Sequence, residues 1–440
     1  MKRLLPISLG CSKNRVDTEK LLAQITAGGL YEVVPDGTSY EDAKADVVII
    51  NTCGFITAAK QESIDTILEA CEAKKRGLVE KVFVFGCLSK RYRDDLIGSI
   101  PEADGFFGTV DDASLLTALG IEPRGSLALY RKLTTPSHYA YLKISEGCDR
   151  RCSYCAIPLI RGPHHSVPID NLVAEAKILA SQGVKELILI AQDTTYYGID
   201  IYGKRRLADL LRELVKVDGI EWIRIHYMYP ADFPLDVLDV MASEPKICKY
   251  VDIPLQHASD KLLGMMHRAA GADYDKELII KIREKVPGVV VRTTMIVGHP
   301  GEGEKEFGEL LDFVKEMKFE RLGAFTYSEE EGTYDAEHCK DSVPESVKKE
   351  RYDRLMEIQE EISKAHNLKR IGNVERVVVD AFADGSFTAR SQGESPEVDG
   401  EIYVMGAFAS GFVPAGTVGS FMNVEITAAD DYDLYAKKID

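Results

Sequence analysis

Long apolar runs are missing from this chain of 440 residues, and their absence argues against a helical membrane protein. No stretch approaches the roughly 18 apolar residues that a membrane-spanning helix needs. The apolar stretch near the first residue covers only residues 4–9 and contains Pro6. It is shorter than the roughly 7–15 residues that form the core of a secretory signal. We therefore expect a cytoplasmic protein without membrane contact, in which thiols stay reduced.

Positive charge is also scarce, because 54 Lys and Arg residues stand against 71 Asp and Glu residues, a net charge of −17. A protein whose whole surface follows a phosphate backbone usually needs a basic face, and this balance argues against one. A local basic patch is still allowed. The acidic excess fits a basic protein as partner.

A disulfide framework, internal repeats and low-complexity runs are absent as well. The nine cysteines are an odd number in a long chain, which does not predict paired disulfides. Free thiols in such a chain are candidate ligands of a metal or a cluster.

Apolar β-rich runs alternate with helical stretches over most of the chain, which predicts an α/β fold with parallel sheets. Residues 1–120 form the first predicted domain, an α/β unit, and residues 121–137 the linker after it. Residues 138–372 predict a partial TIM-like barrel of six βα units, whose active site lies at the C-terminal strand ends. The predicted strands are 4–9, 46–51 and 81–86 in the first domain and 139–144, 186–191, 220–226, 249–255, 289–297 and 321–327 in the second.

Residues 373–440 change to short strands with turns, which predicts a small all-β barrel. From residue 374 onward, twelve Asp and Glu stand against four Lys and Arg, a net charge of −8. A barrel that binds tRNA should carry Lys and Arg to meet phosphates. The acidic charge therefore favours a basic protein partner. An acidic face that is merely solvated is the alternative.

Three cysteines with the spacing C-x₃-C-x₂-C follow a predicted strand directly: Cys148, Cys152 and Cys155. Three thiolates so spaced on one loop can ligate three irons of a [4Fe–4S] cluster and leave the fourth iron open for an external ligand. A zinc site is the alternative, but it would usually need a fourth protein ligand.

Three further cysteines share one position relative to the predicted strands. Cys11, Cys53 and Cys87 each lie one or two residues beyond a strand end. Because the C-terminal ends of parallel strands converge on one crevice, these thiols are expected to meet there. Buried free cysteines are the alternative, since Cys is often simply a small apolar residue. The shared offset favours a second three-cysteine cluster.

The loop of Cys148, Cys152 and Cys155, with Tyr154 before the last cysteine, resembles the radical S-adenosylmethionine (SAM) signature. With the second trio and a TRAM-like terminal barrel, the whole chain is similar to the radical SAM methylthiotransferases. The RimO type, which modifies an aspartate of ribosomal protein twelve of the small subunit, is the closer likeness. The MiaB type, which modifies a tRNA adenosine, is the alternative. The likeness rests on residues 9–19 (LGCSKNRVDTE), 144–148 (ISEGC), 252–257 (DIPLQH), 325–333 (FTYSEEEGT), 395–400 (SPEVDG) and 430–434 (DDYDL).

The resemblance implies two [4Fe–4S] clusters and SAM as cofactors. Cys148, Cys152 and Cys155 would hold the cluster that binds SAM, and the other trio an auxiliary cluster that holds or donates sulfur. One SAM would yield the 5′-deoxyadenosyl radical that abstracts hydrogen from the aspartate β-carbon, and a second SAM would supply the methyl group. Because that hydrogen is barely acidic, a cofactor has to supply the radical.

The implied partners are ribosomal protein twelve, free or in the ribosome, and an electron donor such as flavodoxin or ferredoxin; tRNA is not expected. A non-catalytic electron-transfer protein is the alternative from another class. It would usually ligate each cluster with four cysteines.

Further SAM contacts are expected at Tyr154 and at strand ends. Gln192 and Asp193 follow the strand 186–191, and Gly298 lies in residues 295–302 (MIVGHPGE). These strand ends are where a barrel places its active site. At each position a simple turn is the alternative.

Overall fold

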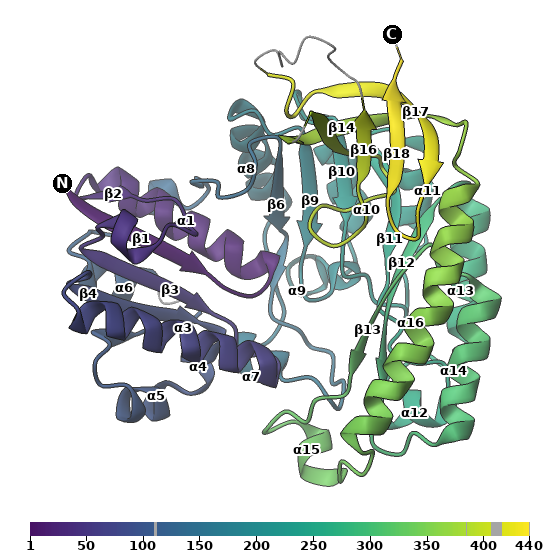
Figure 1. Ribbon diagram of the computed structural model, residues 1–440, viewed down its shortest axis with the longest axis horizontal. Helices are drawn as coiled ribbons and strands as arrows, with labels where there is room; N and C mark the ends of the chain where they lie inside the picture. The colour runs from purple at the N-terminus through teal and green to yellow at the C-terminus, as the bar shows by residue number, and fades with distance from the viewer. Residues whose placement is uncertain (110–111, 384, 406–415, 440) are drawn as a thin grey trace.

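The computed structural model describes residues 1–109, 112–383, 385–405 and 416–439. Three units follow one another along the chain: an N-terminal α/β unit, a large open α/β barrel and a small β-barrel (Figure 1). Within those ranges, no helix is both long and apolar enough to cross a bilayer.

The N-terminal unit is a five-stranded parallel sheet in the order β2-β1-β3-β4-β5. Helices α1 and α6 pack their leucines on one face, and α3 and α5 cover the other face. The central strands are continuous apolar runs because both of their faces are buried. The elements are β1 (Lys2–Ser8), α1 (Ser12–Gly28), β2 (Tyr31–Val33), α2 (Tyr40–Ala43), β3 (Val47–Thr52), α3 (Thr57–Lys75), β4 (Lys81–Gly86), α4 (Cys87–Arg91), α5 (Arg93–Ser99), β5 (Gly105–Phe106) and α6 (Asp112–Ala118).

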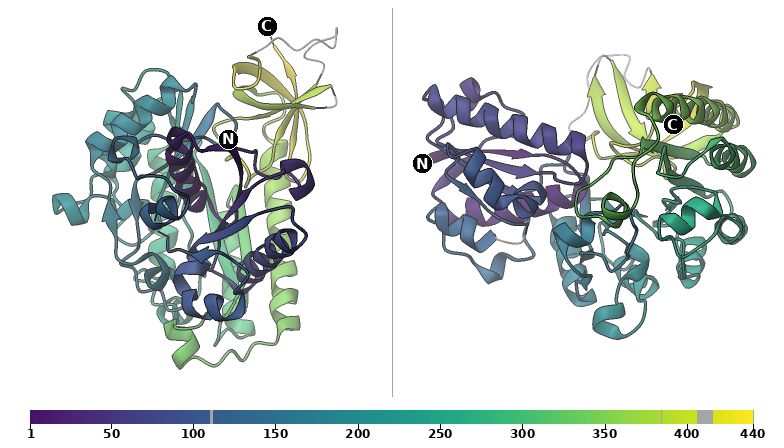
Figure 2. Two further views of the ribbon diagram at one scale, coloured as in Figure 1. Left: turned by 90° about the vertical axis from the view of Figure 1, so that its left-hand side faces the viewer. Right: turned by 90° about the horizontal axis from the view of Figure 1, so that it is seen from below.

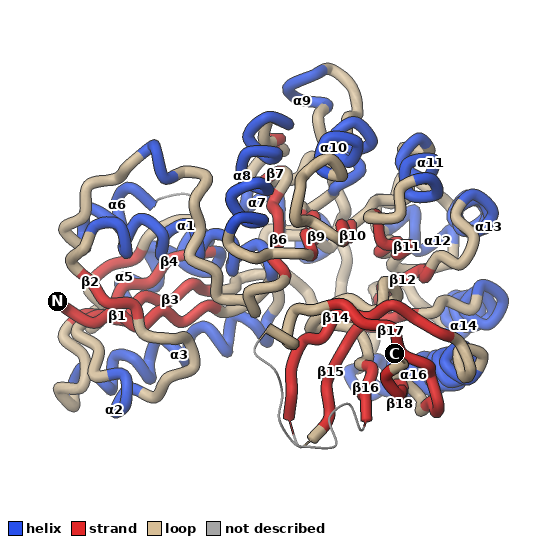
Figure 3. Tube along the Cα trace, turned by 90° about the horizontal axis from the view of Figure 1, so that it is seen from above, coloured by secondary structure: helices blue, strands red, loops and turns tan. Residues whose placement is uncertain are grey.

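The central unit is an open barrel of six parallel strands in the order β13-β12-β11-β10-β9-β6, which confirms the predicted partial barrel. Figure 3 shows its helices on the outer side of the arc of strands. The strands are β6 (Tyr139–Lys143), β9 (Glu186–Ile190), β10 (Trp222–Ile225), β11 (Ile247–Asp252), β12 (Val290–Val297) and β13 (Arg321–Thr326). The outer helices are α8 (Ile169–Ser181), α10 (Leu207–Leu214), α11 (Asp236–Ser243), α13 (Ala272–Lys285), α14 (Glu304–Met317) and α16 (Glu345–Leu368). Shorter elements lie in the loops: β7 (Ser145–Glu146), α7 (Ile157–Arg161), β8 (His165–Ser166), α9 (Ile199–Tyr202), α12 (Asp260–Met265) and α15 (Tyr334–His338), with 3₁₀ turns at Gly125–Leu127 and Thr194–Tyr196.

Strand alternation divides the barrel residues into two sets. Residues such as Leu142, Leu189 and Ile223 point outward into one large apolar core with the helices. The alternate residues point inward, and many of them are polar or charged, including Lys143 and Arg224 on β6 and β10. A polar interior fits a site for charged ligands.

The terminal unit is a closed barrel in the order β14-β15-β16-β18-β17, as predicted. Its strands are β14 (Val374–Ala383), β15 (Ser386–Arg390), β16 (Ile402–Met405), β17 (Phe421–Ala429) and β18 (Leu434–Lys438). The last strand in the chain is β18. It pairs parallel to β16 and antiparallel to β17, and this pairing closes the barrel.

Residues 90–99 do not form one continuous helix. The stretch 90–99 forms two helices, because Tyr92 with φ −126° and ψ 33° interrupts the helical backbone. The first of them, α4, begins at Cys87 itself.

The N-terminal unit lies against the open side of the barrel, between its two edge strands (Figure 2). On the β6 side, Val16 of α1 packs with Tyr139 and Tyr141. On the β13 side, the Oγ of Ser328 lies 3.5 Å from the Oγ1 of Thr57, which begins α3. The first unit therefore covers the gap that six strands leave in the barrel wall.

Candidate functional site

The N-terminal cysteines gather at the C-terminal edge of the first sheet. Cys11 is the N-cap of α1, Cys53 follows β3, and Cys87 begins α4 directly after β4. A Cβ added to Gly10 would lie 2.8 Å from the Cβ of Cys53, and one on Gly54 would lie 3.0 Å from the carbonyl carbon of Cys87. The backbone segments that carry the three thiols are therefore in close contact.

Burial and mutual charge control the ionisation of these thiols. Burial raises the pKa of Cys53 and raises that of Cys87 to about 12. A charge on Cys11 raises both pKa values further, because one thiolate disfavours the next. A bound metal ion would counter these shifts at Cys53 and Cys87, because a cation deprotonates a coordinating thiol.

The second trio lies in the loop between β7 and α7. β7 pairs with β8, and this small hairpin holds the base of the loop. The backbone N–H of Arg150 donates to the Sγ of Cys148 at 3.4 Å. Burial raises the pKa of Cys148 and of Cys155 to about 12, and the neighbouring thiol of Cys152 adds to both shifts. This trio has the same electrostatic character as the first.

The two trios lie side by side across the junction between the units. Cys87 packs with Ala156 and Ile160, which follow Cys155 on α7. Sequence spacing predicted each trio separately, and only the docking of the two units places them together.

Two buried cations lie between the trios, and the sequence analysis did not single out either. Arg161 donates to the Oδ2 of Asp17 at 2.8 Å and to the Oε2 of Glu146 at 3.1 Å, and it also bonds the side chain of Asn14. Lys143 bonds the Oε2 of Glu146 at 2.6 Å and also pairs with Asp17. The partners lie on α1 and around β7, far apart in sequence. Their presence within residues 9–19 and 144–148 was the only signal available beforehand.

Each donor set offers three thiols, the number that holds a [4Fe–4S] cluster with one open iron. Among the described residues, no three His, Cys, Asp or Glu side chains converge closely enough to hold one metal ion. A [4Fe–4S] cluster takes each thiolate on a different iron, so its ligands stand farther apart than those of one zinc ion.

Gln192 and Asp193 follow β9 beside the cysteine loop. The Nε2 of Gln192 donates to Glu146 at 3.1 Å, while its buried Oε1 accepts no hydrogen bond from any described residue. Asp193 is fully engaged, because it accepts from Arg150 Nε at 2.9 Å and from the backbone N–H of Thr195 at 2.9 Å. The Nη2 of Arg150 is buried and unpaired within the described chain. The free atoms of Gln192 and Arg150 thus fit a polar ligand such as SAM, and Asp193 orients Arg150.

Tyr154 and Gly298 differ in their surroundings. Burial raises the pKa of Tyr154 well above its usual value, and the nearby guanidinium of Arg268 opposes that shift. Arg268 also places its Nη1 3.9 Å from the Sγ of Cys152. Gly298 has φ +76°, and a Cβ there would lie 2.3 Å from the Cγ of Lys348 on α16. Packing on α16 explains this glycine, and its contact with adenosine stays a prediction.

A second ion-pair cluster joins the units on the β13 side. Glu330 has a side chain only 2% exposed, and its Oε2 lies 2.8 Å from Lys60 and 3.3 Å from Arg91. Arg91 also donates to the backbone carbonyl of Gly54, next to Cys53, at 3.1 Å. Through these contacts, the segment 325–333 holds the loops that carry the auxiliary thiols Cys53 and Cys87 in place.

Several acidic groups of the terminal barrel face inward. Glu394 pairs with Arg321 at 2.9 Å and Asp399 accepts from the hydroxyl of Tyr250 at 2.6 Å. Glu397 pairs with Arg15 of α1 at 2.5 Å. Part of the −8 charge thus anchors the barrel to the other two units. The outward acidic groups include Glu401, Asp430 and Asp431, which are exposed or half-buried.

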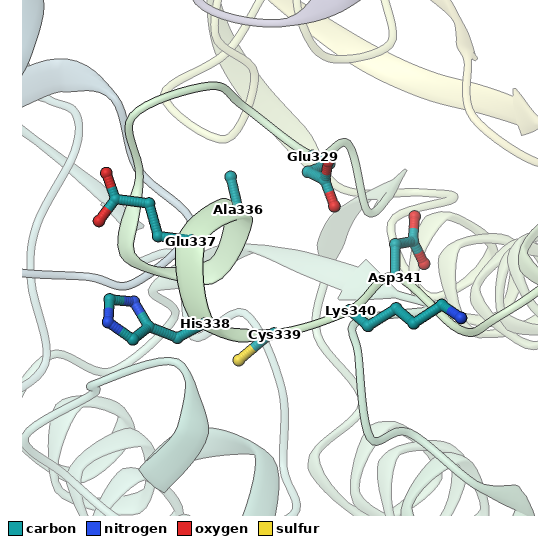
Figure 4. Close-up of a pocket in the computed structure, with 7 residues that line it drawn as sticks. All are labelled: Glu329, Ala336, Glu337, His338, Cys339, Lys340 and Asp341. Carbon is teal, nitrogen blue, oxygen red and sulfur yellow. The ribbon is translucent and has the colours of Figure 1, made fainter.

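A shallow pocket lies on α15 and the residues after it (Figure 4). Its lining includes Cys339 and none of the six clustered cysteines. The side chains drawn there point away from one another, so they do not form a converging donor set.

Comparison with known proteins first defines the class. Residues 142–314 match the radical SAM superfamily. Residues 3–108 match the uncharacterized protein family UPF0004, and residues 371–439 match the TRAM domain. The radical S-adenosylmethionine methyltransferase TsrM from Kitasatospora setae is similar in structure, with a TM-score of 0.55 and 15% identity over 74% of this chain and 72% of that chain. The cobalamin-dependent S-adenosylmethionine radical enzyme OxsB is also similar in structure, with a TM-score of 0.53 and 13% identity over 83% of this chain and 56% of that chain. An open parallel barrel with a three-cysteine loop at its strand ends defines a radical SAM enzyme.

Curated relatives then identify the family. A protein of Porphyromonas gingivalis is 50% identical over 99% of this chain and 98% of its own length. A protein of Cytophaga hutchinsonii is 51% identical over 98% of this chain and 96% of its own length. Both are named ribosomal protein uS12 methylthiotransferase RimO, and this chain belongs to that family. Membership confirms the predicted family, the radical SAM enzyme class, and SAM and [4Fe–4S] clusters as cofactors.

Proposed function

We propose that this protein attaches a methylthio group to the β-carbon of an aspartate in ribosomal protein uS12, the protein twelve of the small subunit. The observation that carries the proposal is the packing of Cys87 against Ala156 and Ile160, which brings the two three-cysteine sites together. A substrate carbon can then be reached from both sites, as proximity requires. The names of the curated relatives support uS12 as the substrate.

In this proposal, Cys148, Cys152 and Cys155 hold the cluster that binds SAM. Cys11, Cys53 and Cys87 hold the auxiliary cluster. When bound, SAM and the clusters supply the radical, the sulfur and the methyl group, which acid–base side chains cannot supply.

The chain itself orients and encloses the reactants. Tyr154, Gln192, Asp193 and Gly298 are the proposed SAM contacts, and the unpaired Oε1 of Gln192 gives that residue the strongest support. Arg161 and Glu330 hold the two units together on either side of the thiols. This arrangement limits access of water to the reaction centre.

The outward acidic groups of the terminal barrel support a basic protein, rather than tRNA, as the macromolecular partner. An electron donor such as a flavodoxin or ferredoxin completes the reaction, which takes place in the cytoplasm. We place the domain boundaries at 1–120, 138–372 and 373–440, with 121–137 as linker. Arg131 of that linker is buried and pairs with Glu19 and Glu175, so the linker is packed between the first two domains.

The test is an anaerobic reaction of the cluster-loaded enzyme with SAM and a one-electron reductant. uS12 and bulk tRNA are offered together, and both are analysed by mass spectrometry. We expect the mass increase of a methylthio group on a single aspartate of uS12. The same increase on tRNA adenosine, with none on uS12, would replace this proposal with the MiaB-type function.

A further inference from the structure

Lys13 is a buried cation without an anionic partner. It lies in the first turn of α1, two residues after Cys11, and is only 8% exposed. Its Nζ lies 3.0 Å from the ring centroid of Tyr227, which follows β10. Within the described residues, no carboxylate pairs with this ammonium group.

Most of the other cations around the cysteine sites have carboxylate partners, whereas Arg268 donates to the backbone carbonyl of Pro254 at 2.6 Å and lies over the ring of Tyr229. Lys143 and Arg161 share Asp17 and Glu146. Arg150 pairs with Asp193 at 2.9 Å, and Arg292 pairs with Asp252 at 3.0 Å. Lys13 differs from them because its one strong contact is the face of an aromatic ring.

A buried ammonium without an anion is costly, because desolvation is not repaid by a charge partner. A cation–π contact offsets only part of this desolvation cost. The site is therefore electrostatically incomplete, and a bound carboxylate would complete it.

Lys13 is also placed where the reaction has to occur. The next residue, Asn14, has its Oδ1 3.5 Å from the Sγ of Cys87 and also bonds Arg161, which follows the second cysteine loop on α7. Tyr227 stands at the C-terminal end of a barrel strand, where such folds bind substrate. An anion bound to Lys13 would lie over the C-terminal strand ends of the barrel, next to the turn of α1 that begins at Cys11.

We propose that Lys13 binds the side-chain carboxylate of the substrate aspartate and so positions its β-carbon between the two cysteine sites. This inference rests on the proposed function. It makes Lys13 a specificity-determining residue that selects aspartate over asparagine.

The experiment measures binding of labelled uS12 to the cluster-loaded enzyme with SAM, for uS12 as it occurs and for a form with the target aspartate changed to asparagine. A hydrogen bond to a charged group contributes about 1.5–3 kcal/mol, so the wild-type enzyme should prefer aspartate by about 10- to 100-fold. Lys13→Met keeps an apolar stem of similar length and should reduce this preference to about onefold. Lys13→Arg should retain a clear preference. Lys90→Gln removes an exposed charge on α4 and should leave the preference intact.

Iron content identifies variants that have lost a cluster. Separate KM values for SAM and for uS12 show which of these two ligands a substitution affects. If Lys13→Met keeps the wild-type preference, or raises the KM for SAM while its affinity for uS12 is unchanged, the inference is wrong. If the wild-type enzyme does not modify uS12, the proposed function is wrong, and so is this inference, which rests on it.

Discussion

At the scale of single residues, we propose that the six clustered cysteines hold the two clusters and that their surroundings give the two trios different tasks. Cys148, Cys152 and Cys155 adjoin Gln192 and Arg150, whose buried unpaired atoms fit a polar ligand. Cys87 packs against Ala156 and Ile160 at the domain junction, and the charge of Arg161 acts on Cys53. We therefore expect the trios to be separable by substitution.

Cys148→Ala should abolish SAM cleavage, because two thiols cannot hold the cluster that binds SAM. Cys53→Ala should retain SAM cleavage and lose sulfur insertion. Chromatography of 5′-deoxyadenosine and mass analysis of uS12 measure the two activities. Cys71→Ala, which alters a buried thiol in the core under α3, is the matched control and should keep both activities. Equal loss of both activities in Cys53→Ala would contradict the division of tasks.

At the scale of elements, the strand ends aim the thiols, and glycines set the turns. Gly86 precedes Cys87 with φ +102°, and a Cβ there would lie 2.7 Å from the backbone nitrogen of Thr52. Gly147 precedes Cys148 with φ +74°, and a Cβ there would lie 2.0 Å from the carbonyl oxygen of Pro163. In both cases the obstacle is backbone, which cannot move aside easily. Only glycine fits such positions without strain.

Gly86→Ala should displace Cys87 and lose the auxiliary cluster, and Gly147→Ala should lose the other cluster. Iron per chain should fall from about eight to about four in each variant, since each cluster holds four irons. Iron analysis and electron paramagnetic resonance show which cluster is lost. Gly77→Ala has a similar φ of +76° with nothing near the added Cβ, and it should keep both clusters. Full iron content in Gly86→Ala would show that the turn tolerates a side chain.

At the scale of the whole molecule, function depends on how the first unit docks on the open barrel. Polar clusters hold this junction, among them those around Arg161 and Lys143, at Glu330, and at Glu175, which lies 3.4 Å from Lys20 of α1. The side chain of Glu330 is only 2% exposed and lies within 3.3 Å of two cations.

Glu330→Ala leaves Lys60 and Arg91 without that carboxylate, and breaking a buried pair costs about 3–5 kcal/mol. We expect the junction to loosen, so that methylthiolation of uS12 falls more than tenfold while SAM cleavage persists. Hydrogen exchange of residues 54–60 should become faster. Glu329→Gln changes the exposed neighbouring carboxylate and should alter neither readout. Unchanged exchange and activity in Glu330→Ala would show that the clamp is dispensable.

The sequence by itself determined the element types and the six thiols. Strand and helix periods are local, and cysteine spacing on one loop is visible without any fold. The offset of Cys11, Cys53 and Cys87 from their strands also implied a common edge, because parallel strands end on one side. Local patterns do not predict short interruptions of a helix, such as the one at Tyr92 between α4 and α5.

Only the tertiary structure decided which charges meet. Arg161 and Asp17, or Lys60 and Glu330, are separated by more than 100 residues, and no period along the chain links them. The same holds for the acidic terminal barrel, whose sequence showed the charge but not that Glu394 and Asp399 turn inward. Lys13 is the clearest case. In the sequence it is one lysine of an acidic protein, and its missing partner becomes visible only after packing has removed it from water.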